Sequence, residues 1–122
     1  MNNTEELGRQ AENQACGFLE RRGLRLLEKN FRCKYGEIDL IMRDGSVLVF
    51  VEVRFRRSHR FGGPLSSITP DKQRRLLLAA QIYLQQHPIK GKYAGSRFDV
   101  VAMSAEAENP EIEWIPNAIE AG

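Results

Sequence analysis

Three carboxylates and one cation occupy two strand-like segments of this chain, and their spacing suits the binding of a metal ion. Glu37 and Asp39 lie two residues apart in the first segment, and Glu52 and Arg54 lie two residues apart in the second. Residues i and i+2 of a strand share one face, and acids on an inward face are costly unless a positive group compensates them. Mg²⁺ or Mn²⁺, which prefer oxygen ligands, would do so. The pattern therefore predicts metal-dependent cleavage of phosphodiester bonds.

The relative positions of these acids depend on the Asp44–Gly45 turn that joins the two segments. An Asp-Gly pair favours a two-residue hairpin loop, and a four-residue loop would give the same register. The predicted pairs are Arg43 with Ser46, Glu37 with Glu52, and Asp39 with Phe50. The acids then lie within roughly 5–8 Å of one another, whereas a three-residue loop would put them on opposite faces. Two interpretations stay open: a metal site, or an exposed sheet face on which arginines neutralise the acids.

The elements that must position these residues follow from periodicity and from stop signals. Helical spacing of apolar residues from Leu7 to Leu19 predicts a first helix that ends before Gly23, and Thr69-Pro70-Asp71 is typical of a second helix start. We expect strands over 24–32, on both sides of the Asp44–Gly45 turn, over 97–103, and over 111–115 as a short edge strand. The order α-β-β-β-α-β, with the edge strand after it, predicts an α/β fold in which helices flank a mixed sheet. The strand after the second helix should run parallel to a neighbour.

Composition limits the class of protein. The 122 residues, 42% hydrophobic and 28% charged, predict one soluble domain over residues 1–122. No apolar run reaches the ~18–20 residues that span a membrane, and the polar N-terminus is unlike a signal peptide. Cys16 and Cys33 fit no zinc spacing and are expected as reduced thiols. We therefore expect a cytoplasmic protein with no membrane partner.

The net charge of +2 conceals an uneven distribution. Residues 1–97 hold all 18 lysines and arginines and 10 acids, a net charge of +8, whereas residues 98–122 hold six acids. A basic body suits a polyanionic partner such as DNA. The acidic C-terminal tail, from about residue 104, either limits indiscriminate binding or packs on the basic surface.

Asp39 followed by Glu52-Val53-Arg54 resembles the signature of the PD-(D/E)xK nucleases, an Asp and then Glu-x-Lys on the next strand. More specifically, the chain resembles the small bacterial YraN family of endonuclease-like proteins over residues from about 7 to 103. The matching segments are the helix with Gly8 and Glu12, Tyr35 to Ile41, Val49 to Arg57, Thr69 to Arg75, and Arg97 to Val101. The resemblance implies a restriction-endonuclease-like core, similar to archaeal Holliday junction resolvases. Because such resolvases act as dimers, it also allows a homodimer.

The resemblance assigns roles to residues. Asp39 and Glu52 would bind one or two divalent cations, and Val53 would offer its carbonyl. Glu12 would correspond to the helix-borne acid of the resolvases; alternatively, it forms a salt bridge to an arginine. Arg54 replaces the motif lysine, and arginine is a poor base. Lys72 would substitute only if the start of its helix faces the site.

Cations follow the acids in two segments. Arg54, Arg56, Arg57 and Arg60 alternate with Phe55, His59 and Phe61, and Lys72, Arg74 and Arg75 crowd the start of the second helix beside Gln73. The expected nucleic-acid-binding residues are Arg56, Arg57, Arg60, Lys72, Gln73, Arg74 and Arg75. The alternatives are a solvated basic strand end and, for Gln73, a plain surface position.

Three functions are compatible with this sequence. The first is a Mg²⁺- or Mn²⁺-dependent nuclease acting on DNA, with branched or single-stranded DNA as candidate substrates. The second is a catalytically inactive module that binds nucleic acid on a nuclease scaffold, because Arg54 has replaced the lysine. The third is a structural domain whose acids only pair with arginines.

Overall fold

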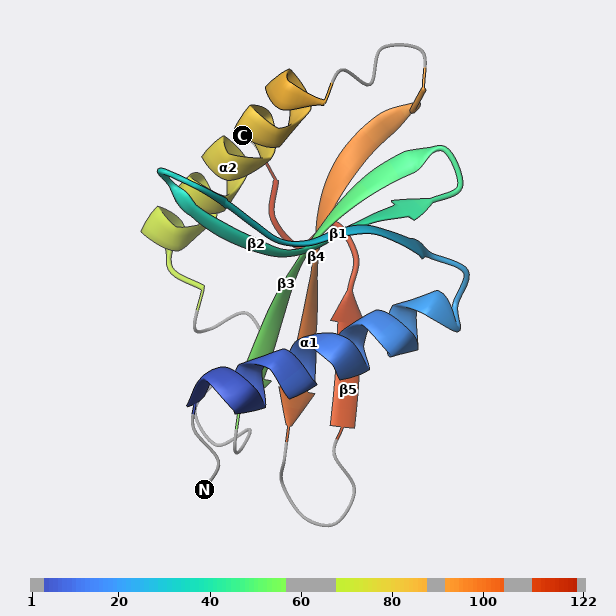
Figure 1. Ribbon diagram of the computed structural model, residues 1–122, viewed down its shortest axis with the longest axis vertical. Coiled ribbons are helices and arrows are strands. Elements are labelled where there is room, and N and C mark those ends of the chain that lie inside the picture. Colours follow the sequence, from blue (N-terminus) through green and yellow to red (C-terminus); the bar gives the residue numbers. More distant parts are fainter. Residues whose placement is uncertain (1–3, 57–67, 88–91, 105–110, 121–122) are drawn as a thin grey trace.

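The computed structural model describes residues 4–56, 68–87, 92–104 and 111–120, and two helices lie on a five-stranded sheet (Figure 1). The elements are α1 (Thr4–Glu20), β1 (Arg25–Cys33), β2 (Gly36–Asp44), β3 (Val47–Arg56), α2 (Pro70–Gln86), β4 (Gly95–Ser104) and β5 (Glu111–Ile115). This α/β order, α-β-β-β-α-β followed by a short strand, confirms the prediction from the sequence. No helix in these described ranges is long and apolar enough to cross a membrane.

The sheet has the order β1-β2-β3-β4-β5 and is mixed. The pairs β1–β2 and β2–β3 are antiparallel, β4 runs parallel to β3, and β5 returns antiparallel to β4. The parallel pair is joined through α2, because parallel neighbours need a long crossover connection. The predicted parallel strand and the predicted edge strand are both confirmed.

The second helix begins where its capping residues predict. Thr69 is the N-cap, with extended backbone angles, and its Oγ1 accepts a hydrogen bond from the Lys72 amide at 3.1 Å. Pro70 occupies the first helical position, where a missing N–H costs nothing. The helix ends at His87, whose amide donates to the Tyr83 carbonyl at 2.9 Å.

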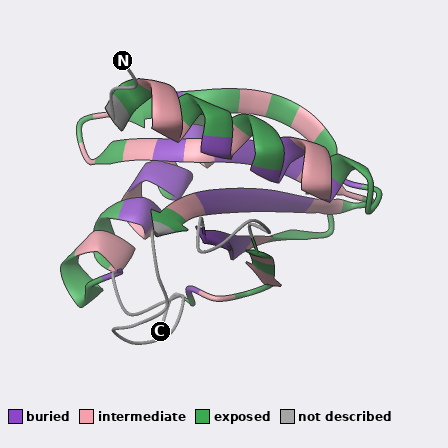
Figure 2. Cartoon of the chain, turned by 90° about the horizontal axis from the view of Figure 1, so that it is seen from below, coloured by how far each residue is buried: buried purple, intermediate pink, exposed green. Residues whose placement is uncertain are grey.

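Each helix covers a separate hydrophobic core on one face of the sheet. The buried face of α1, which includes Ala11, Ala15 and Leu19, packs on residues of β2, β3 and β4 such as Met42 and Val101. The buried residues of α1 lie on its side toward the sheet (Figure 2). Burying a large apolar side chain such as Leu19 contributes about 1.5–3 kcal/mol to stability.

On the other face, α2 packs through an aromatic cluster. The ring of Tyr83 meets Phe31 and Phe50 edge to face, with centroids 5.2 and 5.9 Å apart. Leu76, Ala79 and Ala80 complete the contact of the helix with the sheet. The start of α2 is thereby fixed relative to β2 and β3, the strands that carry the acids.

A buried polar network holds the last strands in place. Asp99 is fully buried and accepts hydrogen bonds from Arg97 Nε (3.0 Å), Trp114 Nε1 (3.0 Å) and the Asn117 amide (2.8 Å). Arg97 Nη2 also donates to Asp44 Oδ2 at 3.0 Å. The network connects β4 to β5 and to the end of β2, and it satisfies every oxygen of a carboxylate that would otherwise be costly to bury.

The hairpin register differs from the predicted one by two residues. Asp44 pairs with Val47, so the loop consists of Gly45 and Ser46, and Phe50 lies opposite Ile41 rather than Asp39. The ion pair with Arg97 keeps Asp44 within the strand, and Gly45 takes the positive φ of 58° that the loop requires. The predicted pairs of Arg43 with Ser46, Glu37 with Glu52, and Asp39 with Phe50 are therefore wrong. A shift of two residues nevertheless keeps each side chain on its face.

Candidate metal centre

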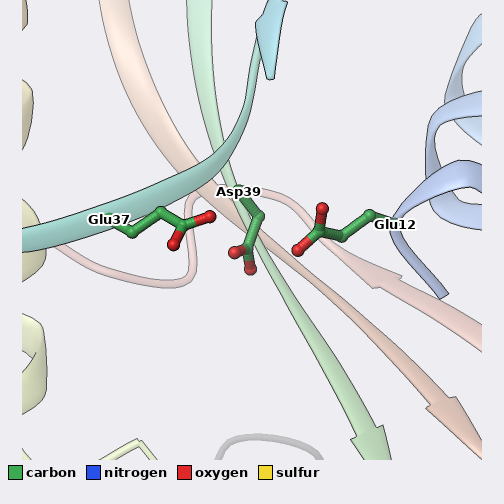
Figure 3. A group of neighbouring side chains, drawn as sticks. All are labelled: Glu12, Glu37 and Asp39. Atoms are coloured by element: carbon green, nitrogen blue, oxygen red, sulfur yellow. The ribbon is translucent and has the colours of Figure 1, made fainter. Parts of the chain in front are cut away.

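Three acids from two elements converge at one end of the sheet. Glu37 and Asp39 come from β2 and Glu12 comes from α1, and one carboxylate oxygen of each lies within 4.8 Å of the others. Figure 3 shows the carboxylates of Glu37 and Glu12 pointing toward Asp39 from opposite sides. The helix periodicity that buries Ala11 and Ala15 places Glu12 at the border of the buried face, directly over the strand.

Glu52 completes the acidic group from β3. Its side chain is buried, with 4% of its surface exposed, and the regular pairing of β2 with β3 ends at Leu40 and Val51, immediately before this position. Beyond that point Asp39 Oδ2 accepts a hydrogen bond from the Val53 amide at 2.8 Å. The carboxylate of Asp39 thus takes the place of a strand partner, which opens the end of the ladder and leaves the acids facing a cavity.

The cavity has a volume of about 230 Å³ and is lined by both acids and cations. Its walls include Gly8, Glu12, Glu37, Asp39, Glu52, Val53, Arg54 and Lys72. A Cβ atom at Gly8 would meet nothing within 4 Å, so this side of α1 is open toward solvent. The cavity is therefore large enough for hydrated ions and a phosphate group and is reached from outside.

Burial and mutual repulsion perturb the acids. Desolvation, followed by the negative charge of Glu52, raises the pKa of Asp39 to about 9. Desolvation and the charge of Glu37 also raise the pKa of Glu12 above its ordinary value. Clustered carboxylates that resist ionisation are relieved by a cation of high charge density. A donor set made only of oxygen atoms is the type that Mg²⁺ and Mn²⁺ prefer.

Three of the described cations compensate part of this charge, and one of them, Arg32, has its Nε 3.4 Å from Glu37 Oε2. Arg54 Nη1 lies 3.2 Å from Glu52 Oε2, and Lys72 Nζ lies 3.7 Å from the same oxygen. Lys72 lies in the first turn of α2 and lines the cavity. From the sequence, Lys72 was expected to substitute for the motif lysine only if the start of its helix faced the acids. Its contact with Glu52 meets this condition.

Glu12 lies among the other acids and beside Asn30. Glu12 makes no ion pair with an arginine within the part of the chain that the structure describes, and it joins the acids instead. With its amide nitrogen turned toward the acids, Asn30 donates a hydrogen bond to Glu12 Oε1 at 3.0 Å. Asn30 was not singled out from the sequence. The signal available in the sequence was an asparagine within a strand, because asparagine adopts positive φ angles more readily than most residues. In the structure the φ of Asn30 is 55°.

The other residues that the sequence predicted to bind nucleic acid or metal lie at several places in the structure. Arg74 and Arg75 both pair with Asp71 on the exposed side of α2. Gln73 Nε2 donates to the Ile68 carbonyl at 3.1 Å, so its amide holds the start of the helix. The backbone of Arg56 pairs with Ser104 in the sheet, whereas Arg57 and Arg60 lie outside the described residues. Val53 lines the cavity and contributes its amide to Asp39.

Comparison with known proteins agrees with the motifs. Residues 11–103 match the model of the uncharacterised protein family UPF0102. The chain is 53% identical over 114 residues to a UPF0102 protein of Methylococcus capsulatus, covering 93% of this chain and 90% of the relative. It is 46% identical over 121 residues to one of Stutzerimonas stutzeri, covering 99% and 100%. The chain therefore belongs to the UPF0102 family, which is the YraN family that its motifs resemble.

Proposed function

We propose that this protein is a divalent-metal-dependent nuclease that hydrolyses phosphodiester bonds of DNA. The observation that carries the proposal is the convergence of four carboxylates from α1, β2 and β3 on one open cavity that also contains Arg54 and Lys72. Isolated surface acids do not need such an arrangement. A site that holds cations and a phosphate does need it, because it requires both oxygen ligands and positive groups.

The ligand set fits Mg²⁺ or Mn²⁺. Asp39, Glu52, Glu37 and Glu12 would hold the ion through carboxylate oxygens, and the Val53 carbonyl is a further candidate. When bound, the ion polarises the phosphate and lowers the pKa of water. The Val53 amide fixes the orientation of Asp39, and Asn30 orients Glu12. Both contacts position the acids before substrate arrives.

Arg54 and Lys72 contribute positive charge to the cavity, and both lie at Glu52. In the transition state the phosphate gains negative charge, and fixed cations at this position stabilise it. Arg54 holds Glu52 and presents donors toward the cavity, although arginine is a poor base. Lys72 supplies the lysine that the strand motif lacks, from a helix instead of from a strand. The substitution at position 54 is thus compatible with catalysis.

The basic body of the chain, with a net charge of +8 over residues 1–97, supports DNA as the substrate. A second candidate function rests on Arg54: if arginine at this position ended catalysis, the same surface would bind nucleic acid without cutting it. The two functions differ in one observable. That observable is cleavage of DNA, for which the nuclease needs Asp39. A module that only binds DNA depends on the salt concentration and not on the acids.

The decisive experiment measures cleavage of labelled single-stranded, duplex and four-way-junction DNA in Mg²⁺, in Mn²⁺ and in EDTA. We compare the wild type with Asp39→Asn and with Glu113→Gln, which removes an exposed acid on the edge strand. Metal-dependent cleavage that Asp39→Asn abolishes and Glu113→Gln retains supports the nuclease. Binding without any cleavage supports the second candidate. Cleavage that persists unchanged in Asp39→Asn contradicts the proposed site.

A further inference from the structure

We infer that the tip of the β1–β2 hairpin and the first turns of α2 form a site for one unpaired base of single-stranded DNA and its flanking phosphates. This stacking site consists of Lys34, Tyr35, Arg74, Arg75 and Leu78, which line one cavity of about 190 Å³. The inference rests on the proposed function for the choice of DNA. It adds the class of substrate, a strand with an unpaired base.

Tyr35 is presented by the hairpin turn. Cys33 pairs with Gly36, so Lys34 and Tyr35 form the two-residue loop between the strands. Gly36 takes a φ of +136°, which a residue with a side chain rarely adopts. Tyr35 is only half-buried, and it lines a second cavity of about 360 Å³ as well. Tyr35 therefore presents an aromatic ring to two cavities, and such a ring is a surface on which an unpaired base can stack.

Positive charge surrounds the Tyr35 ring. Lys34 Nζ lies 5.2 Å from the ring centroid, and Arg74 and Arg75 approach from α2. Both arginines pair with the single carboxylate of Asp71, so these four charged residues have a net charge of +2. None of the described residues that line the smaller cavity is acidic. This distribution favours phosphate groups on both sides of a base, and it separates the stacking site from the acidic centre.

The stacking site and the candidate metal centre are built from neighbouring parts of the β1–β2 hairpin and α2, although no described residue lines both cavities. Tyr35 precedes Glu37 by two residues, which is roughly 7 Å along a strand. Lys72 precedes Arg75 by one turn of α2, and Lys72 lies at Glu52. A strand whose base stacks on Tyr35 would therefore bring a phosphate about one nucleotide away toward the acids. In a duplex both faces of each base are already stacked, so the site discriminates against paired DNA.

The test measures the affinity of the full chain, in EDTA and at fixed salt, for a fluorescein-labelled thymidine oligonucleotide and for a hairpin duplex. We expect Tyr35→Ala to weaken single-strand binding at least about fivefold, since stacking on an aromatic residue contributes that much per base. Tyr35→Trp should retain the affinity, and neither variant should change duplex binding by more than about twofold. Lys34→Ala should weaken binding of the single strand, because it removes a positive charge beside the flanking phosphates. Arg25→Ala, which removes an exposed arginine at the start of β1, is the matched control.

Folding of each variant is verified by circular dichroism and by its melting temperature. Equal single-strand affinity of the wild type, Tyr35→Ala and Tyr35→Leu would overturn the inference, as would a wild type that binds duplex more tightly than the single strand. These outcomes are separate from the proposed function, because metal-dependent cleavage that requires Asp39 would stand even if Tyr35 contributed nothing. Conversely, loss of cleavage with intact Tyr35-dependent binding would refute the nuclease and leave the stacking site.

Discussion

Replacing Asp39 by asparagine should stabilise the metal-free protein and abolish its response to divalent cations. Asparagine keeps the shape of the side chain and an oxygen that accepts the Val53 amide, which donates to Asp39 at 2.8 Å. It removes a titrating group whose charged form burial and Glu52 disfavour. The substitution therefore removes an electrostatic cost while it preserves the local hydrogen bond.

The magnitude follows from the pKa of Asp39, which is raised from 3.8 to about 9 in the folded protein. The pKa of Asp39 is thus higher in the folded protein than in the unfolded chain. Asp39 therefore stabilises the fold fully at a pH below the unfolded pKa, and this contribution is lost as the pH rises through the folded pKa. Between pH 3.8 and pH 7 the loss is at most about 4 kcal/mol, at 1.36 kcal/mol per pH unit. Because solvent reaches part of the carboxyl, screening reduces it to about 1–2 kcal/mol.

A gain of this size raises the melting temperature of a domain of this length by about 4–8 °C. The difference between Asp39→Asn and the wild type should grow from pH 5 to pH 9, because only the wild type carries the titrating group. A divalent cation at 100 times its Kd would stabilise the wild type by about 2.7 kcal/mol and should have little effect on the variant. Calorimetry in EDTA and in MnCl₂ across this pH range measures both effects.

Glu113→Gln is the control, since it removes an acid outside the cavity and should respond to metal as the wild type does. The reasoning would be refuted if Asp39→Asn melted lower than the wild type in EDTA at pH 8. It would also be refuted if the variant kept the full stabilisation by Mn²⁺.

Four further predictions concern catalysis and stability. Lys72→Met should reduce the cleavage rate about 100-fold while DNA affinity changes little, and a rate equal to that of the wild type would exclude this role of Lys72. Arg54→Lys should retain cleavage, and a variant that does not cleave would exclude the role given to Arg54. Thr69→Ala should lower stability by about 1 kcal/mol through loss of the N-cap, measured by urea denaturation against Thr69→Ser, and an equal loss in both would argue against the cap. Asp99→Asn should cost about 3 kcal/mol, because it removes the buried one of the two described charge partners of Arg97 and leaves only Asp44; a change below about 1 kcal/mol would show that the network contributes little.

Much of the fold is encoded locally and was predicted from the sequence. Thr69-Pro70 specifies a helix start through one side-chain hydrogen bond and one fixed φ angle, and both are independent of the rest of the chain. The spacing of Ala11, Ala15 and Leu19 marks the buried face of α1 in the same way. The sequence also predicted that Glu37, Asp39 and Glu52 would lie together, and they line one cavity. Side-chain alternation alone does not place them, because Ile38 packs in the core under α2 and Leu40 in the core under α1.

Contacts between segments that are distant in the chain decided those features of the fold and of the site that the sequence did not predict. The hairpin register depends on Arg97, which is 53 residues beyond Asp44 in the chain and holds it in the strand. Asn30 is recognisable as a partner of Glu12 only after α1 has packed over β1, because neither residue identifies the other by spacing.

The sequence by itself determined the elements, their order, the acids and the cations, because these follow from short-range hydrogen bonding and from side-chain periodicity. Only the tertiary structure decided that Lys72 lies at Glu52 and that Tyr35 lies beside Arg74 and Arg75. Both arrangements depend on the packing of α2 through Tyr83 on the sheet, which fixes the rotation and the position of the helix. That packing is the sum of many weak non-local contacts, and no local pattern in the sequence specifies it.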